Sequence, residues 1–247
     1  MNNKETGKFK GKDVNKAIKP RILYEDNHII VINKLTSELV QGDKTGDETL
    51  GDSVSAYLKT TYNKPGNVFL GTVHRLDRPT SGAVVFAKTS KALSRLNNMF
   101  RDNEVKKIYW AVTDAMPPDE HGVLEHYLLR NQKQNKSYAH SSSVEGSKLA
   151  KLDYRVVKAT DRYYLLQIEL HTGRHHQIRA QLAAVGCRIK GDLKYGSPRS
   201  NPGGGIHLHA RRISFIHPVS KVPIDVTAPA PKDPLWDIFS SADDASN

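Results

Sequence analysis

The chain has 247 residues, of which 38% are hydrophobic and 26% charged, as in a globular protein that can bury a substantial core. No apolar run reaches the roughly 20 residues that span a bilayer, and the N-terminus lacks a signal-peptide core, so we expect a cytoplasmic location. The single cysteine, Cys187, excludes an internal disulfide and a thiolate metal cluster. The net charge of +11 favours a polyanionic partner, nucleic acid before an anionic membrane, although a basic surface can also serve solubility alone.

The N-terminal half divides into a polar arm and several short elements. Residues 1–20 are lysine-rich and aperiodic, which predicts a flexible basic arm. Residues 22–34 predict two short strands with a turn at Asp26-Asn27. Apolar residues at helical spacing predict helices over residues 49–58 and 90–100, the second with Ser90 as its cap.

The C-terminal half is richer in strand patterns. Strands are predicted at residues 107–113, 150–157, 163–170, 206–210, 213–218 and 222–226, with an exposed hairpin or loop over 132–143 and a helix that Gly186 ends. The pattern predicts one mixed α+β domain over residues 21–235, without the alternating order of βαβ units. A polar tail is expected over residues 236–247.

One polar stretch, HRLDRPTSG at residues 74–82, lies between the apolar segments 68–70 and 83–87. Both segments predict buried strands, so the polar stretch is expected to be a loop held by the core. Its acid, Asp77, is flanked by Arg75 and Arg78, and two nearby cations favour the ionised carboxylate. Asp77 can then act as a nucleophile, a general base or an ion-pair partner. The alternative is an ordinary strand connection with a surface salt bridge.

Several motifs in this chain resemble those of one enzyme family. The stretch at 74–82 resembles the HRLDxxTSG signature of the RluA-type pseudouridine synthases, and TGRHHQIR at 172–179 resembles their TGRxHQIR segment. GDLKYG at 191–196 is similar to GDxxYG, and LHA at 208–210 and HP at 217–218 match later elements of the family. Together these motifs cover roughly residues 21–230 in the family's order.

The resemblance implies a single pseudouridine-synthase-like domain with a large mixed or antiparallel sheet, flanking helices and a central RNA-binding cleft. It implies isomerisation of uridine to pseudouridine in rRNA or tRNA without a cofactor or metal. By position, Asp77 falls on the catalytic aspartate, Tyr109 on the active-site tyrosine and Arg179 on the basic residue that pairs with the aspartate. Arg174 is the alternative partner of Asp77.

The reaction explains why these residue types are needed. The bond from uracil N1 to ribose C1′ must break, the base must turn, and C5 must join C1′. A carboxylate can attack C1′ or C6, or remove the 2′ proton, and the sequence leaves these open. The target base is expected to flip into the site. Contacts with substrate or RNA are expected from eight further residues: His74, Arg75, Arg78, Thr80, Lys107, Arg174, His176 and Gln177.

Other interpretations remain at this point. A non-catalytic RNA-binding or RNA chaperone protein of the same fold is the main alternative. The histidines at 171, 175, 176, 207 and 209 suggest a metal site, but no carboxylate stands at ligand spacing; His176 and His209 are expected to make structural hydrogen bonds. The family's Lys-Pro and Gly are replaced by Lys34-Leu35-Thr36-Ser37, which predicts a different local turn. We expect a monomer, and a catalytic domain without the S4 domain of many relatives.

Overall fold

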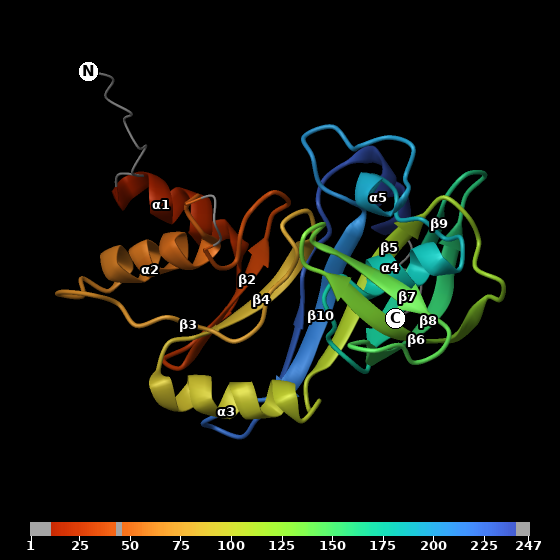
Figure 1. The fold of residues 1–247 in the computed structure, drawn as a ribbon. Helices are drawn as coiled ribbons and strands as arrows, with labels where there is room; N and C mark the ends of the chain where they lie inside the picture. Colours follow the sequence, from red (N-terminus) through yellow and green to blue (C-terminus); the bar gives the residue numbers. More distant parts are fainter. Residues whose placement is uncertain (1–10, 43–45, 241–247) are drawn as a thin grey trace, which may run out of the picture.

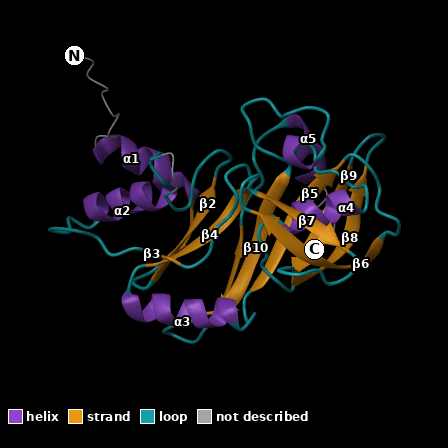
Figure 2. Ribbon diagram, in the orientation of Figure 1, coloured by secondary structure: helices purple, strands orange, loops and turns teal. Residues whose placement is uncertain are grey.

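The computed structural model describes residues 11–42 and 46–240 (Figure 1). Its centre is one mixed sheet, shown with its flanking helices in Figure 2. The strands are β1 (Ile22–Glu25), β2 (Ile29–Lys34), β3 (Gly71–Thr72), β4 (Ser81–Ala87), β5 (Lys106–Thr113), β6 (His121–Asn131), β7 (Lys136–His140), β8 (Lys148–Ala159), β9 (Tyr164–Leu170), β10 (Leu208–Ile216) and β11 (Pro223–Thr227). The helices are α1 (Gly11–Ile18), α2 (Leu50–Thr61), α3 (Ser90–Arg101), α4 (Gln177–Ala184) and α5 (Pro234–Ser240), with 3-10 turns at Lys19–Arg21 and Leu193–Tyr195.

The strand order is β1-β2-β4-β10-β5-β9-β8-β6-β7, with β3 beside β4 and β11 beside β10. Among the described strands, only β4 and β10 pair in parallel, and the other pairs are antiparallel. The expectation of one α+β domain with a large mixed sheet is therefore confirmed. The parallel pair brings β10, from the C-terminal part of the chain, next to the strand that follows the Asp77 loop.

Alternating side chains of the strands build cores on both faces of the sheet. On one face, Ile32 and Phe86 pack with α1 and α2, and Ile168 packs with α4 further along the sheet. On the other face, Val85 packs with α3 and Trp110 with α5. Figure 1 shows α2 and α4 well separated, over different halves of the sheet. The central strands β4, β10 and β5 lie between these two helices.

Both predicted ends of the domain are wrong by several residues. Residues 11–18 form α1, in which Val14 and Ile18 are buried against α2, so this half of the expected flexible arm is ordered; residues 1–10 lie outside the described residues. Two apolar residues four apart on a helix share a face, and that spacing was the available signal. At the other end, Trp236 and Phe239 of α5 are buried, so residues 236–240 of the expected polar tail belong to the packed domain; residues 241–247 lie outside the described residues.

Smaller differences concern single elements. Residues 68–70 form no strand; the short strand before the Asp77 loop is Gly71–Thr72, which pairs with β4. The two late strands predicted over 206–218 are one strand, β10, with a register shift between Ala210 and Arg212. The cap of α3 is Thr89, whose hydroxyl accepts the N–H of Ala92, and not Ser90. The hairpin alternative over 132–143 is confirmed, because β6 and β7 pair across a turn that includes residues 132–135.

Candidate active site

The Asp77 loop is held from below by a buried lysine. Lys34, at the end of β2, has no exposed surface, and its Nζ donates to the carbonyl oxygens of Leu35, Asp77, Arg78 and Thr80 at 2.6 to 3.3 Å. Burial lowers the pKa of Lys34 to about 8, opposed by the negative charges of Glu38 and Asp77. An ammonium group bonded to the carbonyls of Asp77, Arg78 and Thr80 fixes the course of the loop from Asp77 onward.

The same loop contacts the segment that departs from the family's Lys-Pro pattern. The N–H of Ser37 donates to the carbonyl of Arg78, and Ser37 has a left-handed φ of 69°. The turn therefore forms with serine at a position where glycine would be unstrained. The Arg78 guanidinium contacts the same turn: its Nε donates to the carbonyl of Ser37, and its Nη1 lies 3.0 Å from Oδ2 of Asp47.

Arg179 joins two carboxylates. Its Nη1 donates to Oδ2 of Asp77 at 3.0 Å, while Nε and Nη2 donate to both oxygens of Asp192 at 2.6 and 2.8 Å. Burial opposes the charged form, but the bonds to Asp192 and Asp77 outweigh it and raise the pKa of Arg179. Asp192 is fully buried, whereas the side chain of Asp77 is 28% exposed. The expected contact between Arg179 and Asp77 is confirmed, and Arg174 does not replace Arg179 in it.

Tyr109 completes the floor of the site. It lies on β5, which pairs with β10, and it lines a small pocket with Asp77, Arg179 and Leu208. Burial, assisted by the charge of Asp77, raises the pKa of Tyr109, so its phenol stays protonated at neutral pH. The pocket has a volume of about 110 Å³ and opens into a cleft of about 1360 Å³.

His176 lies next to the carboxylate of Asp77, and Tyr195 contacts His176. The Nε2 atom of His176 lies 3.6 Å from Oδ2 of Asp77, and its Nδ1 lies 3.0 Å from the Tyr195 hydroxyl. That hydroxyl also accepts the N–H of Ser137, while its ring packs against the guanidinium of Arg179 at 5.1 Å. Tyr195 thereby connects β7 to the charged centre. Burial, and then the charge of Arg179, lowers the pKa of His176 to about 2, so the ring is neutral.

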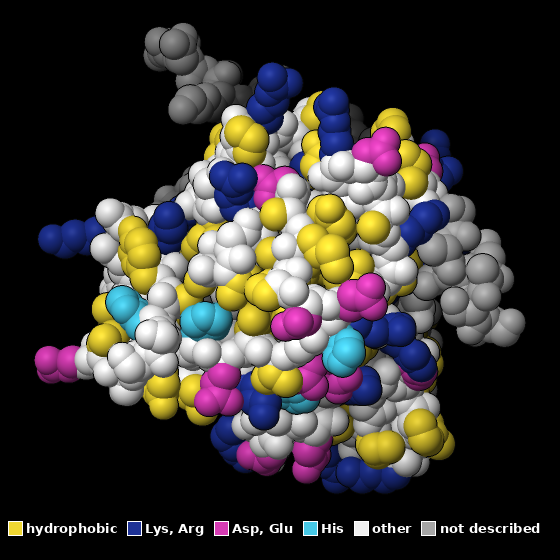
Figure 3. All heavy atoms as spheres, turned by 90° about the vertical axis from the view of Figure 1, so that its right-hand side faces the viewer, with side chains coloured by type: hydrophobic (Ala, Val, Ile, Leu, Met, Phe, Trp, Pro, Cys, Tyr) yellow, Lys and Arg dark blue, Asp and Glu magenta, His cyan; other side chains and the backbone are white. Residues whose placement is uncertain are grey.

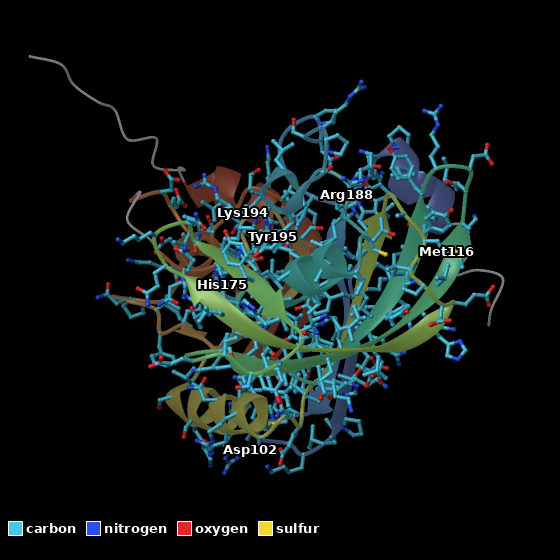
Figure 4. The ribbon with its side chains drawn as sticks, turned by 45° about the vertical axis from the view of Figure 1, so that its right-hand side comes forward. Asp102, Met116, His175, Arg188, Lys194 and Tyr195 are labelled. Carbon is cyan, nitrogen blue, oxygen red and sulfur yellow. The ribbon has the colours of Figure 1, made fainter. Side chains whose placement is uncertain are left out.

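The cleft is strongly cationic. Eight of its lining side chains are Lys or Arg and one is acidic, Asp77; the cations are Arg75, Arg78, Arg101, Lys107, Arg130, Arg174, Arg179 and Lys194. In Figure 4, Lys194 and Tyr195 lie next to each other near His175, away from Arg188 and Met116. By contrast, the face drawn in Figure 3 shows Lys and Arg interspersed with Asp and Glu. A groove of one charge sign concentrates a polyanion.

The tip of the β6–β7 hairpin forms one wall of this cleft. Lys194 donates to the carbonyls of Gln134 and Asn135, and His175 bonds to Ser137 and Asn135. The His175 ring stacks on that of His176 with centroids 3.8 Å apart. The hairpin is therefore anchored to the residues around Asp77, an arrangement that the sequence did not predict.

The eight expected substrate contacts fall into two groups. His74, Arg75, Arg78, Lys107, Arg174 and His176 line the cleft. Thr80 and Gln177 line the small pocket beside Asp77 instead, although they are only 2% and 3% exposed. Gln177 accepts from Thr172 and from the N–H of Arg174 and donates to Lys151, which holds the loop before α4 against β8.

The histidines do not form a metal centre within the part of the chain that the structure describes, where no three His, Cys, Asp or Glu side chains gather for one. His209 bonds to Ser81 and to the carbonyl of Ala228, which confirms its structural role. Nor is any helix of residues 11–42 and 46–240 long and apolar enough to cross a membrane.

Sequence reasoning missed Lys34, Asp192 and Lys194 as parts of the site. The signals were a lysine ending the apolar run of β2, and an acid and a lysine inside the GDLKYG motif, for which no role had been assigned. Each of these residues bonds to a partner that is distant in sequence. Spacing along the chain therefore does not predict their roles.

Comparisons with known proteins agree with this geometry. Residues 28–184 match the family model described as RNA pseudouridylate synthase. The chain is 32% identical over 215 residues to an uncharacterised RNA pseudouridine synthase of Synechocystis, covering 85% of this chain and 65% of that protein. It is 31% identical over 222 residues to ribosomal large subunit pseudouridine synthase D of Zymomonas mobilis, covering 86% and 69%. The chain thus spans about two thirds of these relatives.

The fold is also similar to solved structures. Human RNA pseudouridylate synthase domain containing 4 superposes with a TM-score of 0.77 at 24% identity, covering 94% of this chain and 96% of that one. At this identity the similarity concerns the fold alone.

Proposed function

Since the chain belongs to the RNA pseudouridylate synthase family, we propose that it isomerises uridine to pseudouridine in structured RNA, either rRNA or tRNA, with Asp77 as the catalytic carboxylate. The observation that carries the proposal is the pairing of Asp77 with Arg179 at the base of a cationic cleft. A hydrogen bond from a buried guanidinium keeps the carboxylate oriented. A cleft lined by eight cations suits the phosphates of an RNA strand.

The residues of the pocket fit the steps that the isomerisation requires. The N1–C1′ bond breaks, the base turns, C5 bonds to C1′, C5 loses its proton, and N1 gains one, so no atoms are added or lost. In this proposal Asp77 acts on the ribose or on the base, and Arg179 holds its charge throughout. Tyr109, protonated and partly buried beside Asp77, offers an aromatic face to the detached uracil.

The small pocket implies that the uridine leaves the RNA stack. Its walls include Tyr109 and Leu208 from the sheet and His176 from the start of α4, so a base within a helix would not reach Asp77. Flipping of the target nucleotide brings it there, at a cost of a few kcal/mol that contacts with the flanking phosphates can offset. Arg75, Lys107 and Arg174 line the larger cleft and are proposed for these contacts.

The decisive experiment is pseudouridine mapping of total RNA from cells with and without the gene. We expect one or a few uridines to lose their modification on deletion and to regain it with the wild-type gene. Asp77→Asn should not restore them, although the variant keeps the size of the side chain. If Asp77→Asn restored them, catalysis by Asp77 would be excluded; unchanged maps together with RNA binding would favour the non-catalytic RNA-binding alternative.

A further inference from the structure

We propose that His176 is a positioning residue that, together with Arg179, holds one oxygen of Asp77 and leaves the other for the substrate. The inference rests on the proposed function, because it assigns a role to a second neighbour of the same carboxylate. Sequence reasoning placed His176 among the RNA contacts and structural hydrogen bonds, without a link to Asp77.

The two oxygens of Asp77 have different surroundings. Both Nη1 of Arg179, at 3.0 Å, and Nε2 of His176, at 3.6 Å, approach Oδ2. Oδ1 has no hydrogen-bond partner among the described residues, and Asp77 lines both the cleft and the small pocket. One oxygen is therefore held from behind, and the other faces the space where the uridine would lie.

The neutral ring of His176 can serve this role in one tautomer. With the proton on Nε2, the N–H dipole is directed to the carboxylate, and Nδ1 accepts the hydroxyl proton of Tyr195 at 3.0 Å. The carbonyl of Ser137, 3.1 Å from the same hydroxyl, competes for that proton. The charge of Asp77 favours the Nε2–H form. A separation of 3.6 Å exceeds a hydrogen bond, but such contacts in free enzymes often tighten when substrate binds.

The backbone of His176 gives an independent argument. The residue has a left-handed φ of 54° at the N-terminus of α4, a conformation that costs a non-glycine residue about 1 to 2 kcal/mol. Glycine would adopt it without that cost. The ring is nevertheless buried, with Tyr195 at its Nδ1 and His175 stacked on it. A side chain kept at a strained position beside the carboxylate suggests that the ring itself is needed.

Three substitutions separate the ring's role from its backbone. His176→Gln places an amide N–H near the position of Nε2, His176→Asn reaches only the region of Nδ1, and His176→Gly suits the left-handed backbone. Urea unfolding of each variant reports whether it folds. Turnover is measured by tritium release from [5-³H]uridine-labelled total RNA of cells lacking the gene, as kcat and KM separately.

We expect His176→Gly and His176→Asn to lower kcat by about 10- to 100-fold, because a misplaced carboxylate reacts slowly, while KM changes little. His176→Gln should recover most of kcat. An unchanged kcat in His176→Gly, or a change confined to KM, would overturn the inference and leave His176 as an RNA contact. Absence of release by the wild-type protein would instead overturn the proposed function, and the inference with it.

A second measurement needs no RNA. Nitrogen-15 NMR of the imidazole distinguishes the tautomers, and we expect a protonated Nε2 and an unprotonated Nδ1 for His176 in the wild-type protein. Tyr195→Phe, which removes the hydroxyl at Nδ1, should perturb this signal. A wild-type ring protonated at Nδ1 would present a lone pair to Asp77 and would contradict the proposal.

Discussion

Two carboxylates share Arg179 but differ in what surrounds them. Asp192 is fully buried and takes two hydrogen bonds from the guanidinium, whereas Asp77 takes one and is open to the cleft. Burying a charge is tolerated only when it is paired and hydrogen-bonded. Asp192 therefore pairs with the charge of Arg179 and fixes the plane of its guanidinium. In this orientation Nη1 donates to Asp77.

This difference predicts opposite effects for two matched substitutions. Asp192→Asn leaves the buried Arg179 with only the partly exposed Asp77 as its counter-charge and should lower the free energy of unfolding by about 3 kcal/mol or more. Asp77→Asn, at a partly exposed site, should change it by about 1 kcal/mol or less but abolish turnover. Urea unfolding and tritium release measure the two quantities. Equal destabilisation by both changes would contradict the assignment of Asp192 as the structural member of the pair.

Lys34 carries a further prediction at this scale. Lys34→Met keeps the length of the side chain but leaves the carbonyls of Asp77, Arg78 and Thr80 without their shared donor. Because each unsatisfied buried acceptor costs about 1 to 3 kcal/mol, partly offset by the removal of a buried charge, we expect a net loss of about 2 kcal/mol in unfolding free energy. Urea unfolding tests this, with Lys91→Met on the exposed side of α3 as the control. A stability equal to that of the control would contradict it.

At the scale of elements, the β6–β7 hairpin and the turn with Lys194 form one wall of the cleft. Lys194 is held by backbone carbonyls, and within the described residues no acid lies in salt-bridge distance of it. An ammonium group fixed by neutral acceptors retains its full charge for a phosphate. The hairpin is thus suited to hold RNA beside the pocket. It lies there although it is far from Asp77 along the chain.

Removal of this charge should weaken RNA binding in a salt-dependent way. We expect Lys194→Gln to reduce the slope of log K against log salt by about 1, because one phosphate contact releases about one counterion. Arg155→Gln is the control, since Arg155 neighbours the core residue Tyr154 on β8 and points to the opposite face of the sheet. Filter binding of labelled tRNA at several salt concentrations measures the slope. An equal effect of both substitutions would argue against a specific contact at Lys194.

For the whole molecule, the histidines buried in neutral form predict acid sensitivity. Burial lowers the pKa of His209 to about 4, that of His74 to about 3 and that of His176 to about 2, from an ordinary value of 6.5. Below pH 6.5 these histidines bind protons in the unfolded chain but not in the folded protein, so stability falls as the pH drops from 6.5 towards 4. Three such groups give a slope of about 4 kcal/mol per pH unit.

Urea unfolding at about pH 7 and pH 5 tests this slope. The variant His209→Asn should lose roughly a third of it, because only two of the three histidines then contribute. A free energy of unfolding that stays constant between these pH values would show that these rings accept protons in the folded state.

Local sequence determined much of this protein. Amphipathic spacing placed α2 and α3, strand patterns placed most of the sheet, and the motifs around Asp77, Tyr109 and Arg179 named the charged centre, because these features depend on neighbours within a few residues. Lys34 and the α1 residues Val14 and Ile18 were not recognised as buried. Their environment comes from other parts of the chain, so composition alone pointed to solvent.

Only the tertiary structure decided how the site is held. Arg179 meets Asp77 across 102 positions in the sequence, and Lys34 reaches the Asp77 loop across 43. The order of strands brings these segments together, and burial then determines which side chains stay charged and which, like His176, become neutral supports. Hydrogen bonds and desolvation act over a few ångströms in space, and spacing along a chain does not record such distances.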